Sequence, residues 1–418
     1  MKILLSAYAC DAKSGSESGI GWNFAKELAN QGNKVTILTK NPAKDTAFTE
    51  EIQRLGLQNR ISVLYYDLPR WLQTIYKSGG RSEQLFYIFW QIGIYFYVKK
   101  LLKKQEVDLI HHITIGVFRT PSFLYSLGKP FVFGPVGGGE EFPKVLMENF
   151  LPKYRLLENL RSFANSTARF NPWLIQCFKK SQLILLKTSD NLNFIPKEFH
   201  YKCKVSLEVG IAQIPDFDNT RHNKTIKILY AGRLAYFKGI HLAIKAFAKA
   251  VAIHPDIEFT IVGSGNDEKW LKDIARQQQV YDKITWVPFV ARNVLFEMYK
   301  EYDLLLFPSL HDSSGGVVLE ALSFGLPVVC LDLGGPKEII DSKCGFIIST
   351  KNLTEDEVAI KLSEALNQLI SNPALLAQMQ AHARMQASTF TWDKVIQKIY
   401  TYVHESMEKK NRLVEAKV

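Results

Sequence analysis

Short apolar runs recur along the whole chain, and the segments between them carry apolar residues at helical spacing. This alternation is typical of parallel sheets whose strands are joined by helices. In the first half, the runs predict strands near 2–8, 35–38, 107–113, 130–136, 183–186 and 205–209. In the second half, they predict strands near 226–230, 257–262, 284–287, 304–307, 328–331 and 346–348. The sequence therefore predicts an α/β protein with two doubly wound, Rossmann-like domains.

The length of 418 residues exceeds what one hydrophobic core usually serves, so we expect two or three domains. A polar stretch at 210–223 that contains Pro215 is the candidate hinge. We place the first domain at 1–215 and the second at 216–391. We expect residues 392–418 to carry a long amphipathic helix that crosses back to the first domain.

The segment Leu85–Val98 is the most apolar part of the chain, and lysines follow it at 99, 100, 103 and 104. Its length is too short for a helix that crosses the hydrocarbon core of a bilayer. Two interpretations stay open. One is a buried helix of the first domain, and the other is a helix that lies in the headgroup layer with its lysines on anionic lipid.

Composition is that of an ordinary globular enzyme, with 47% hydrophobic and 22% charged residues. The five cysteines form no CxxC pair, and an odd number argues against a disulfide framework. We therefore expect a reducing cytoplasmic location and no structural zinc. The opening MKILLSAYAC runs directly into polar residues, so we interpret it as a first strand and not as a signal peptide.

Charge is distributed unevenly, because residues 1–215 carry the whole net charge of +11 and residues 216–418 are neutral. The first half should therefore face an anionic partner, such as a membrane surface, a lipid phosphate or an acidic glycan. Nucleic acid is disfavoured, because the chain lacks the interleaved aromatic and basic motifs of single-strand or RNA binders. A basic balance that only aids solubility is the simpler alternative.

Several candidate binding residues follow the strands of the first half. A loop with Gly15, Gly19 and Gly21 follows the first strand, but its spacing is not that of a nicotinamide or flavin site, and we expect no cofactor. His111 and His112 end another strand, and only one of them can face a given site. Two histidines without a third ligand do not make a metal site. A run of glycines before Glu140, at Gly137, Gly138 and Gly139, indicates either close contact with a ligand or a plain turn.

In the second half, the first strand is followed by Gly232 and Arg233, and Lys238 comes just before a helix. A guanidinium and an ammonium near a helix start suit a diphosphate, although surface positions would be the default for both. Gly263 closes the next strand and could bring the backbone near a base or phosphate. Val290, after the following strand, could contact a nucleobase.

The stretch from Phe307 to Gly335 carries the strongest candidate site. Asp312 lies in a loop, Gly315 and Gly316 precede a helix, and Glu320 lies on that helix. A helix start offers unpaired N–H groups to anions, and carboxylates accept hydrogen bonds from sugar hydroxyls. A capped helix with a solvent-facing Glu320 is the alternative.

Two motifs of the second half, AGRLAYFKG and PSLHDSSGGVVLEALSFGLPVV, resemble the donor-binding half of the retaining family 4 glycosyltransferases. ACDAKSGSESGIGWN and FGPVGGGE in the first half resemble a bacterial subgroup of that family with a GPVGGG loop. The resemblance spans nearly the whole chain. It implies the GT-B fold, in which an acceptor-binding and a donor-binding Rossmann-like domain face each other across a cleft.

The resemblance also implies roles for single residues. Members of the family carry a Glu-x7-Glu pair, and the second glutamate, Glu320 here, holds the ribose of the nucleotide. The first contacts the hydroxyls of the donor sugar, and Asp312 takes that position with a side chain one methylene shorter. Arg233 and Lys238 match the pair that binds and neutralises the diphosphate.

Further roles follow from the same resemblance. The amides of Gly315 and Gly316 would hold the donor, and the loop of Gly15 would close over the phosphates. One of His111 and His112 would be the histidine of the cleft. The glycines at 137–139 and Glu140 would lie on the acceptor side.

The expected function is transfer of a hexosyl group from a UDP- or GDP-sugar to a cell-envelope, exopolysaccharide or lipid-linked glycan acceptor. No dedicated nucleophile is evident, so the resemblance implies front-face attack assisted by the departing phosphate, without a metal ion. Alternatives are an epimerase or phosphorylase of the same fold and a non-enzymatic protein that binds anionic lipid. We expect a cytoplasmic enzyme that can bind the inner face of the membrane peripherally.

Overall fold

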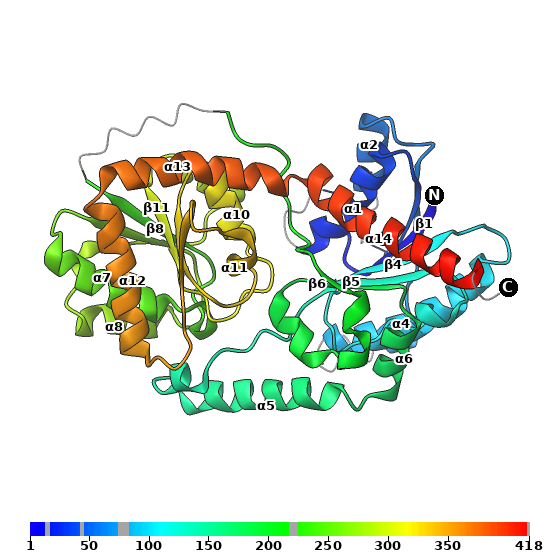
Figure 1. Ribbon diagram of the computed structural model, residues 1–418, viewed down its shortest axis with the longest axis horizontal. Coiled ribbons are helices and arrows are strands. Elements are labelled where there is room, and N and C mark those ends of the chain that lie inside the picture. Colours follow the sequence, from blue (N-terminus) through cyan, green and yellow to red (C-terminus); the bar gives the residue numbers. More distant parts are fainter. Residues whose placement is uncertain (13–16, 42–45, 74–82, 217–224, 416–418) are drawn as a thin grey trace. The chain divides into compact units, whose positions relative to one another are not determined.

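The computed structural model describes residues 1–12, 17–41, 46–73, 83–216 and 225–415 and contains two compact units (Figure 1). Unit 1 comprises Met1–Gly139, Ala164–Glu208 and Trp392–Val418, and unit 2 comprises Glu140–Phe163 and Val209–Thr391. The segment at 140–163, which the sequence analysis placed in the first domain, groups with unit 2. Part of the expected hinge, at 217–223, lies outside the described residues.

Unit 1 is built on a seven-stranded sheet with the order β3-β2-β1-β4-β5-β6-β7, and neighbouring strands pair in parallel (Figure 1). The order turns back at β1, as expected of a doubly wound fold. The strands are β1 (Lys2–Ala7), β2 (Lys34–Thr39), β3 (Ile61–Tyr65), β4 (Leu109–Thr114), β5 (Phe131–Val136), β6 (Leu183–Leu186) and β7 (Cys203–Val205).

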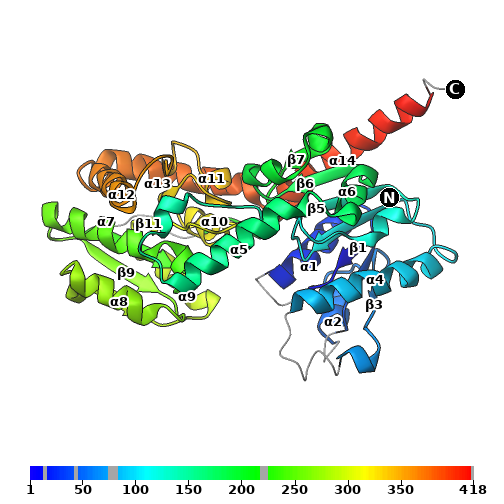
Figure 2. The same cartoon turned by 90° about the horizontal axis from the view of Figure 1, so that it is seen from below.

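Helices cover the sheet of unit 1 (Figure 2), and apolar side chains of the strands pack under them. The helices are α1 (Glu17–Asn30), α2 (Thr46–Arg54), α4 (Glu83–Leu101), α6 (Pro172–Lys180) and α14 (Trp392–Glu415). The short helices are η1 (Phe123–Ser126), η3 (Ser189–Phe194) and η4 (Lys197–Lys202), and α5 (Pro152–Ala168) begins in unit 2 and ends in unit 1.

Unit 2 is built on a six-stranded parallel sheet with the order β10-β9-β8-β11-β12-β13. Its strands are β8 (Lys227–Ala231), β9 (Glu258–Val262), β10 (Ile284–Val287), β11 (Leu304–Phe307), β12 (Val328–Leu331) and β13 (Gly345–Ile348). The strand order again turns back at the first strand, β8. Unit 2 is therefore a second doubly wound unit.

The helices of unit 2 alternate with its strands, as the hydrophobic pattern predicts. They are α7 (Ile240–Ile253), α8 (Glu268–Gln277), α9 (Arg292–Tyr299), α10 (Gly316–Ser323), α11 (Pro336–Ile339), α12 (Glu355–Ile370) and α13 (Pro373–Ala387). Short helices are η2 (Lys144–Met147), η5 (Tyr236–Lys238), η6 (Tyr281–Lys283) and η7 (Ser388–Phe390). A capping box fixes the start of α12, where Thr354 and Glu357 exchange side-chain and backbone hydrogen bonds.

Three details differ from the expected elements. The strand expected near 205–209 lies earlier, because β7 pairs in register with the short β6 and this pairing ends at Val205. The sequence pattern did not identify β3. The helix α4 extends the apolar segment to 19 residues and, unlike a fully buried helix, keeps one face exposed. Among the described residues, no helix combines the length and apolarity needed to cross a bilayer.

Candidate functional site

The predicted site segments of unit 2 all follow the carboxyl ends of neighbouring strands. Gly232 follows β8, Gly263 follows β9, Val290 follows β10, and Asp312 follows β11. Because the strands are parallel, these segments share one edge of the sheet, near the labels β8, β11 and α10 in Figure 1. Ligands bind at this edge in doubly wound sheets.

Lys238 and Asp312 form an ion pair within this edge. The Nζ atom of Lys238 lies 2.7 Å from Oδ2 of Asp312 and 3.3 Å from the carbonyl oxygen of His311. Both side chains of the pair keep only 17% of their surface exposed. A cation on η5 is therefore held against the loop that leads into α10.

Asp312 also organises the start of α10. Its Oδ1 accepts hydrogen bonds from the backbone N–H groups of Ser314 at 3.1 Å and Gly315 at 2.8 Å. Burial raises the pKa of Asp312, but Lys238 and these two N–H groups outweigh burial, so the pKa lies below its ordinary value. The carboxylate thus stays charged at neutral pH. It leaves the first N–H groups of the helix itself, which begins at Gly316, for a ligand.

Glu320 pairs with a residue that the sequence analysis did not identify. Two nitrogens of the Arg292 guanidinium contact Oε1 of Glu320. Nε donates a hydrogen bond at 2.8 Å, and Nη2 lies 2.7 Å from the same oxygen. Burial nevertheless raises the pKa of Glu320, and Arg292 and Tyr299 offset this only in part. Arg292 lies 28 positions before Glu320 and on another helix, so no spacing signal could have linked them.

The glycines of the site differ in what their backbone requires. Gly239 and Gly315 both have positive φ, and a Cβ at these positions would meet Pro308 O at 1.8 Å and Ile339 Cδ1 at 2.7 Å. A Cβ at Gly263 would meet the carbonyl oxygen of Gly232 at 1.9 Å. Packing within unit 2 thus explains these three glycines. Gly316 is different, because a Cβ there would meet nothing within 4 Å.

Arg233 and Val290 were predicted to contact the diphosphate and the base. Arg233 is exposed in the loop after β8, and Val290 is partly exposed in the loop after β10. The two loops after β9 and β10 are joined, because the backbone N–H of Phe289 donates to Oγ of Ser264 at 3.0 Å. Phe289 itself is 78% exposed, so a large aromatic surface faces outward beside Val290.

The segment 140–163 packs on the site loops of unit 2, which the sequence analysis did not foresee. The rings of Tyr154 and Tyr236 stack with centroids 4.0 Å apart, and the Tyr236 hydroxyl donates to Glu158 at 2.8 Å. Arg161 contacts the ring of His311, the neighbour of Asp312. The α5 residues Tyr154, Glu158 and Arg161 therefore contact η5 and the loop after β11.

His111 and His112 lie in unit 1, on opposite faces of β4 as expected, and both are fully buried. His111 bonds the Tyr400 hydroxyl of α14 at 3.0 Å and the Gly134 carbonyl at 2.8 Å. His112 bonds the hydroxyl of Tyr87 on α4 at 3.0 Å. Burial lowers their pKa values to about 4 and about 3, so both rings are neutral at neutral pH. Neither ring is open to a ligand in this structure.

The glycine run after β5 has partners inside unit 1. The N–H of Gly139 donates to Asn191 Oδ1 at 2.8 Å, and Gly138, with φ +94°, bonds Arg119 through its carbonyl at 2.8 Å. The N–H of Gly137 donates to Gly116 O at 2.9 Å. Packing accounts for this run, and contact of 137–140 with an acceptor stays a prediction. Gly15 lies outside the described residues.

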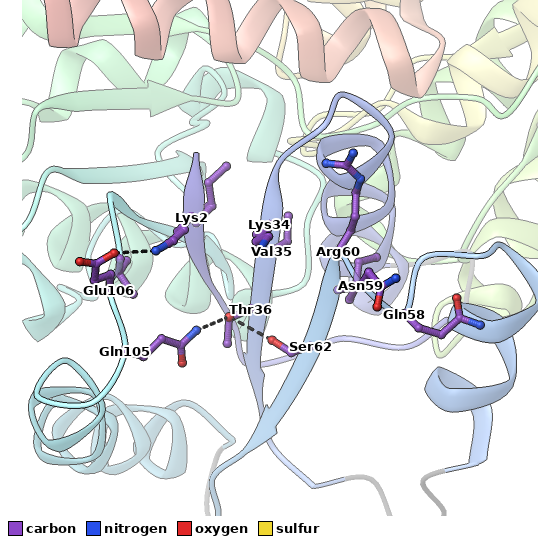
Figure 3. A pocket seen from close by; sticks show the side chains of 13 residues that line it. Lys2, Lys34, Val35, Thr36, Gln58, Asn59, Arg60, Ser62, Gln105 and Glu106 are labelled. Atoms are coloured by element: carbon purple, nitrogen blue, oxygen red, sulfur yellow. Dashed lines mark hydrogen bonds and ion pairs between the residues drawn. The ribbon is translucent and has the colours of Figure 1, made fainter.

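A small polar cavity of about 220 Å³ lies at the opposite, amino edge of the unit 1 sheet (Figure 3). Several of its polar groups are paired within it: Lys2 with Glu106 at 2.6 Å, and Thr36 with both Ser62 and Gln105 at 3.1 Å. Because ligands bind at the carboxyl edges of such sheets, we assign no role in the site to this cavity.

Comparison with known proteins addresses the second half of the chain. Residues 213–386 match the family described as Glycosyl transferases group 1. The match includes the unit 2 segments from Gly232 to Glu320, but not the segment 140–163.

Curated relatives match over about the same segment. The chain is 30% identical over 177 residues to an uncharacterized glycosyltransferase of Haemophilus influenzae, covering 42% of this chain and 47% of that protein. It is 32% identical over 172 residues to a glycogen synthase of Mycobacterium tuberculosis, covering 40% of each. The chain thus spans less than half the length of these curated relatives.

Solved structures resemble the chain over nearly its whole length. The apo form of WaaB, a lipopolysaccharide outer core galactosyltransferase, has a TM-score of 0.62 at 14% identity and covers 97% of this chain and 99% of that one. HepE of Anabaena in complex with UDP has a TM-score of 0.57 at 17% identity, covering 97% and 100%. These similarities show the fold, which is the two-domain GT-B fold predicted from the sequence.

Proposed function

We propose that this protein is a retaining glycosyltransferase that moves a hexosyl group from a nucleotide-diphosphate sugar to a glycan or lipid-linked glycan acceptor. The observation that carries the proposal is the Lys238–Asp312 pair at the start of α10, on the edge of a sheet where ligands bind. The family of residues 213–386 and the UDP bound to HepE support a nucleotide-sugar donor.

In this proposal, the donor diphosphate lies between Lys238, Arg233 and the N-terminus of α10. The ammonium and the helix N–H groups are fixed before the donor arrives, so they stabilise the charge that develops as the diphosphate leaves. Glu320 accepts hydrogen bonds from the ribose hydroxyls, and Phe289 and Val290 flank the base.

The chemical step exchanges one bond for another at the anomeric carbon. The bond from this carbon to the phosphate oxygen breaks, and the acceptor oxygen forms its bond on the same face. The departing phosphate oxygen takes the proton of the acceptor hydroxyl, so the reaction needs no protein nucleophile. Asp312 positions the donor through Lys238 and the 314–315 backbone. The anomeric configuration of the donor is then retained.

The test uses the purified full chain and a panel of UDP- and GDP-sugars. We expect slow hydrolysis of one of them, and faster release of the nucleoside diphosphate when a glycan acceptor is added. Proton NMR of the product should show the anomeric configuration of the donor. Failure to bind UDP or GDP and to consume any of the sugars would contradict the proposal, and an inverted product would contradict the retaining mechanism alone.

A further inference from the structure

The helix α4 of unit 1 is apolar on both of its faces. Its inner face is buried in the core and carries Tyr87, Trp90, Ile94 and Val98. A surface helix normally presents polar residues to water on its other face. Here the outer face carries large apolar residues that are 39–65% exposed: Leu85, Ile88, Phe89, Ile92 and Phe96.

A cavity of about 580 Å³ lies beside this outer face, which falls in the size range of ligand pockets. The short helix η1 contacts both α4 and α6 and closes the cavity between them. The lining is mostly apolar, and Trp173, the second residue of α6, is 60% exposed at its rim. Apolar lining residues are Ile88, Ile92, Phe96, Pro121, Phe123 and Trp173.

One buried polar side chain lines the same cavity. Gln91 is fully buried, and neither its amide nitrogen nor its amide oxygen has a hydrogen-bond partner among the described residues. An unpaired buried amide costs about 1–3 kcal/mol. A purely apolar occupant would leave that cost in place. An occupant with an oxygen acceptor next to its hydrocarbon part would remove it.

The charges around the cavity indicate the kind of occupant. Lys99, Lys100, Lys103 and Lys104 are all exposed at the end of α4. Arg119 lines the cavity itself. The first half of the chain, to which these residues belong, carries the whole net charge of +11. An exposed apolar face next to clustered lysines suits an anionic bilayer.

We infer that unit 1 docks on anionic membranes by taking one acyl chain of an anionic glycerophospholipid into this cavity. The acyl chain lies along Ile92 and Phe96, and the ester oxygen accepts a hydrogen bond from the Gln91 amide. The lysines that follow α4 contact neighbouring headgroups. The helix lies in the headgroup layer and does not cross the bilayer. This inference rests on unit 1 alone and does not depend on the proposed reaction.

The first experiment measures binding of the full chain to vesicles by co-sedimentation. Wild type should bind vesicles of phosphatidylglycerol and phosphatidylcholine, and binding to pure phosphatidylcholine should be much weaker. Ile92→Asp/Phe96→Asp should lower the partition coefficient at least about tenfold, because it charges the docking face. Both side chains are already exposed, at 41% and 65%, so the variant should keep the wild-type circular dichroism spectrum.

The matched control is Ile253→Asp, which changes an isoleucine that is 62% exposed at the end of α7 in unit 2. It should bind vesicles as wild type does. Equal binding by Ile92→Asp/Phe96→Asp and wild type would overturn the inference. A dimer that this variant dissociates, together with no vesicle binding by wild type, would also overturn it and assign the face to a second copy of the chain.

A second experiment reports on the cavity itself. Vesicles whose phosphatidylglycerol carries brominated acyl chains should quench Trp173, and the quenching should fall in Trp173→Phe although vesicle binding continues. Gln91→Leu should bind monomeric short-chain phosphatidylglycerol several-fold more weakly than wild type. Unchanged quenching in Trp173→Phe, or equal lipid affinity of Gln91→Leu, would show that no acyl chain enters the cavity.

Discussion

The ammonium nitrogen of Lys238 lies 2.7 Å from Oδ2 of Asp312 and thereby links η5 to the loop before α10. The ion pair holds a cation at the edge of the sheet without a ligand, so little reorganisation is needed when a diphosphate arrives. The other carboxylate oxygen of Asp312 accepts hydrogen bonds from the N–H groups of Ser314 and Gly315. Asp312, whose side chain is shorter than the glutamate that the family resemblance implies at this position, therefore stabilises the loop and the helix start of the site.

Replacement of Lys238 tests this cation directly. Lys238→Ala should lower kcat about 100- to 1,000-fold, the usual cost of removing one fixed electrostatic group. Lys249→Ala, an exposed lysine on the neighbouring helix α7, is the control and should keep wild-type turnover. Steady-state release of the nucleoside diphosphate measures both. Wild-type kcat in Lys238→Ala would remove Lys238 from the mechanism.

Substitutions at the adjacent Gly315 and Gly316 can distinguish a glycine needed for folding from a glycine that leaves space for a ligand. Gly315→Ala should destabilise the protein by at least about 1 kcal/mol, since its φ of +70° disfavours any side chain. Gly316→Ala should leave stability unchanged or raise it by up to about 1 kcal/mol, because a Cβ there meets open space. If a donor occupies that space, Gly316→Ala should still lower kcat/KM at least about tenfold. Thermal unfolding and turnover are measured together, and full activity of Gly316→Ala would place the donor elsewhere.

Glu320 should show opposite effects on stability and on ligand binding. Its folded-state pKa lies above the ordinary 4.5, so its contribution to stability is present below pH 4.5 and is lost as pH rises through the folded pKa. Glu320→Gln keeps the shape without the charge. We expect the difference in the free energy of unfolding between this variant and wild type to shift in favour of the variant by up to about 1 kcal/mol as pH rises from 4 to 7.

The same substitution should weaken nucleotide binding. Loss of a charge-assisted hydrogen bond to the ribose should raise the Kd for UDP or GDP about tenfold or more in calorimetry. Glu297→Gln, which changes a glutamate of α9 that is 72% exposed, is the control for both measurements. A variant that loses stability at pH 7 and binds nucleotide normally would make Glu320 a structural residue.

Most strands could be predicted because buried parallel strands are short apolar runs, and β6, β10, β11 and β12 have the predicted bounds. The exceptions have physical reasons. The strand β3 has no continuous buried apolar run, because its residues after Ile61 are only partly buried or exposed, so the hydrophobic pattern did not reveal it. The bounds of β7 depend on its pairing with β6, and pairing is a tertiary property.

The site could be predicted where chemistry is local. Lys238, Asp312 and Glu320 follow strand ends or helix starts, and glycines next to them mark the turns. Residues that come from distant segments, such as Arg292 and Arg161, could not be predicted, because no spacing rule links them to their partners. The two histidines at 111 and 112 show the converse case. Their strand end looks open in sequence but is covered here by α14 and α4, and a role for either ring in the site stays a prediction.

His241, the second residue of α7, should make the protein sensitive to acid. It is buried between Phe150 and Trp270, neither ring nitrogen has a partner among the described residues, and burial lowers its pKa to about 3. The unfolded chain takes up this proton near pH 6.5, so stability falls as pH drops below that value. The free energy of unfolding of wild type should therefore fall by roughly 2 kcal/mol more than that of His241→Leu when the pH is lowered from 7 to 5, as measured by urea unfolding. The control is His404→Leu, which removes an exposed histidine of α14 and should not reproduce this effect. If His241→Leu and wild type differ in stability by the same amount at both pH values, His241 is not the group that makes the protein sensitive to acid.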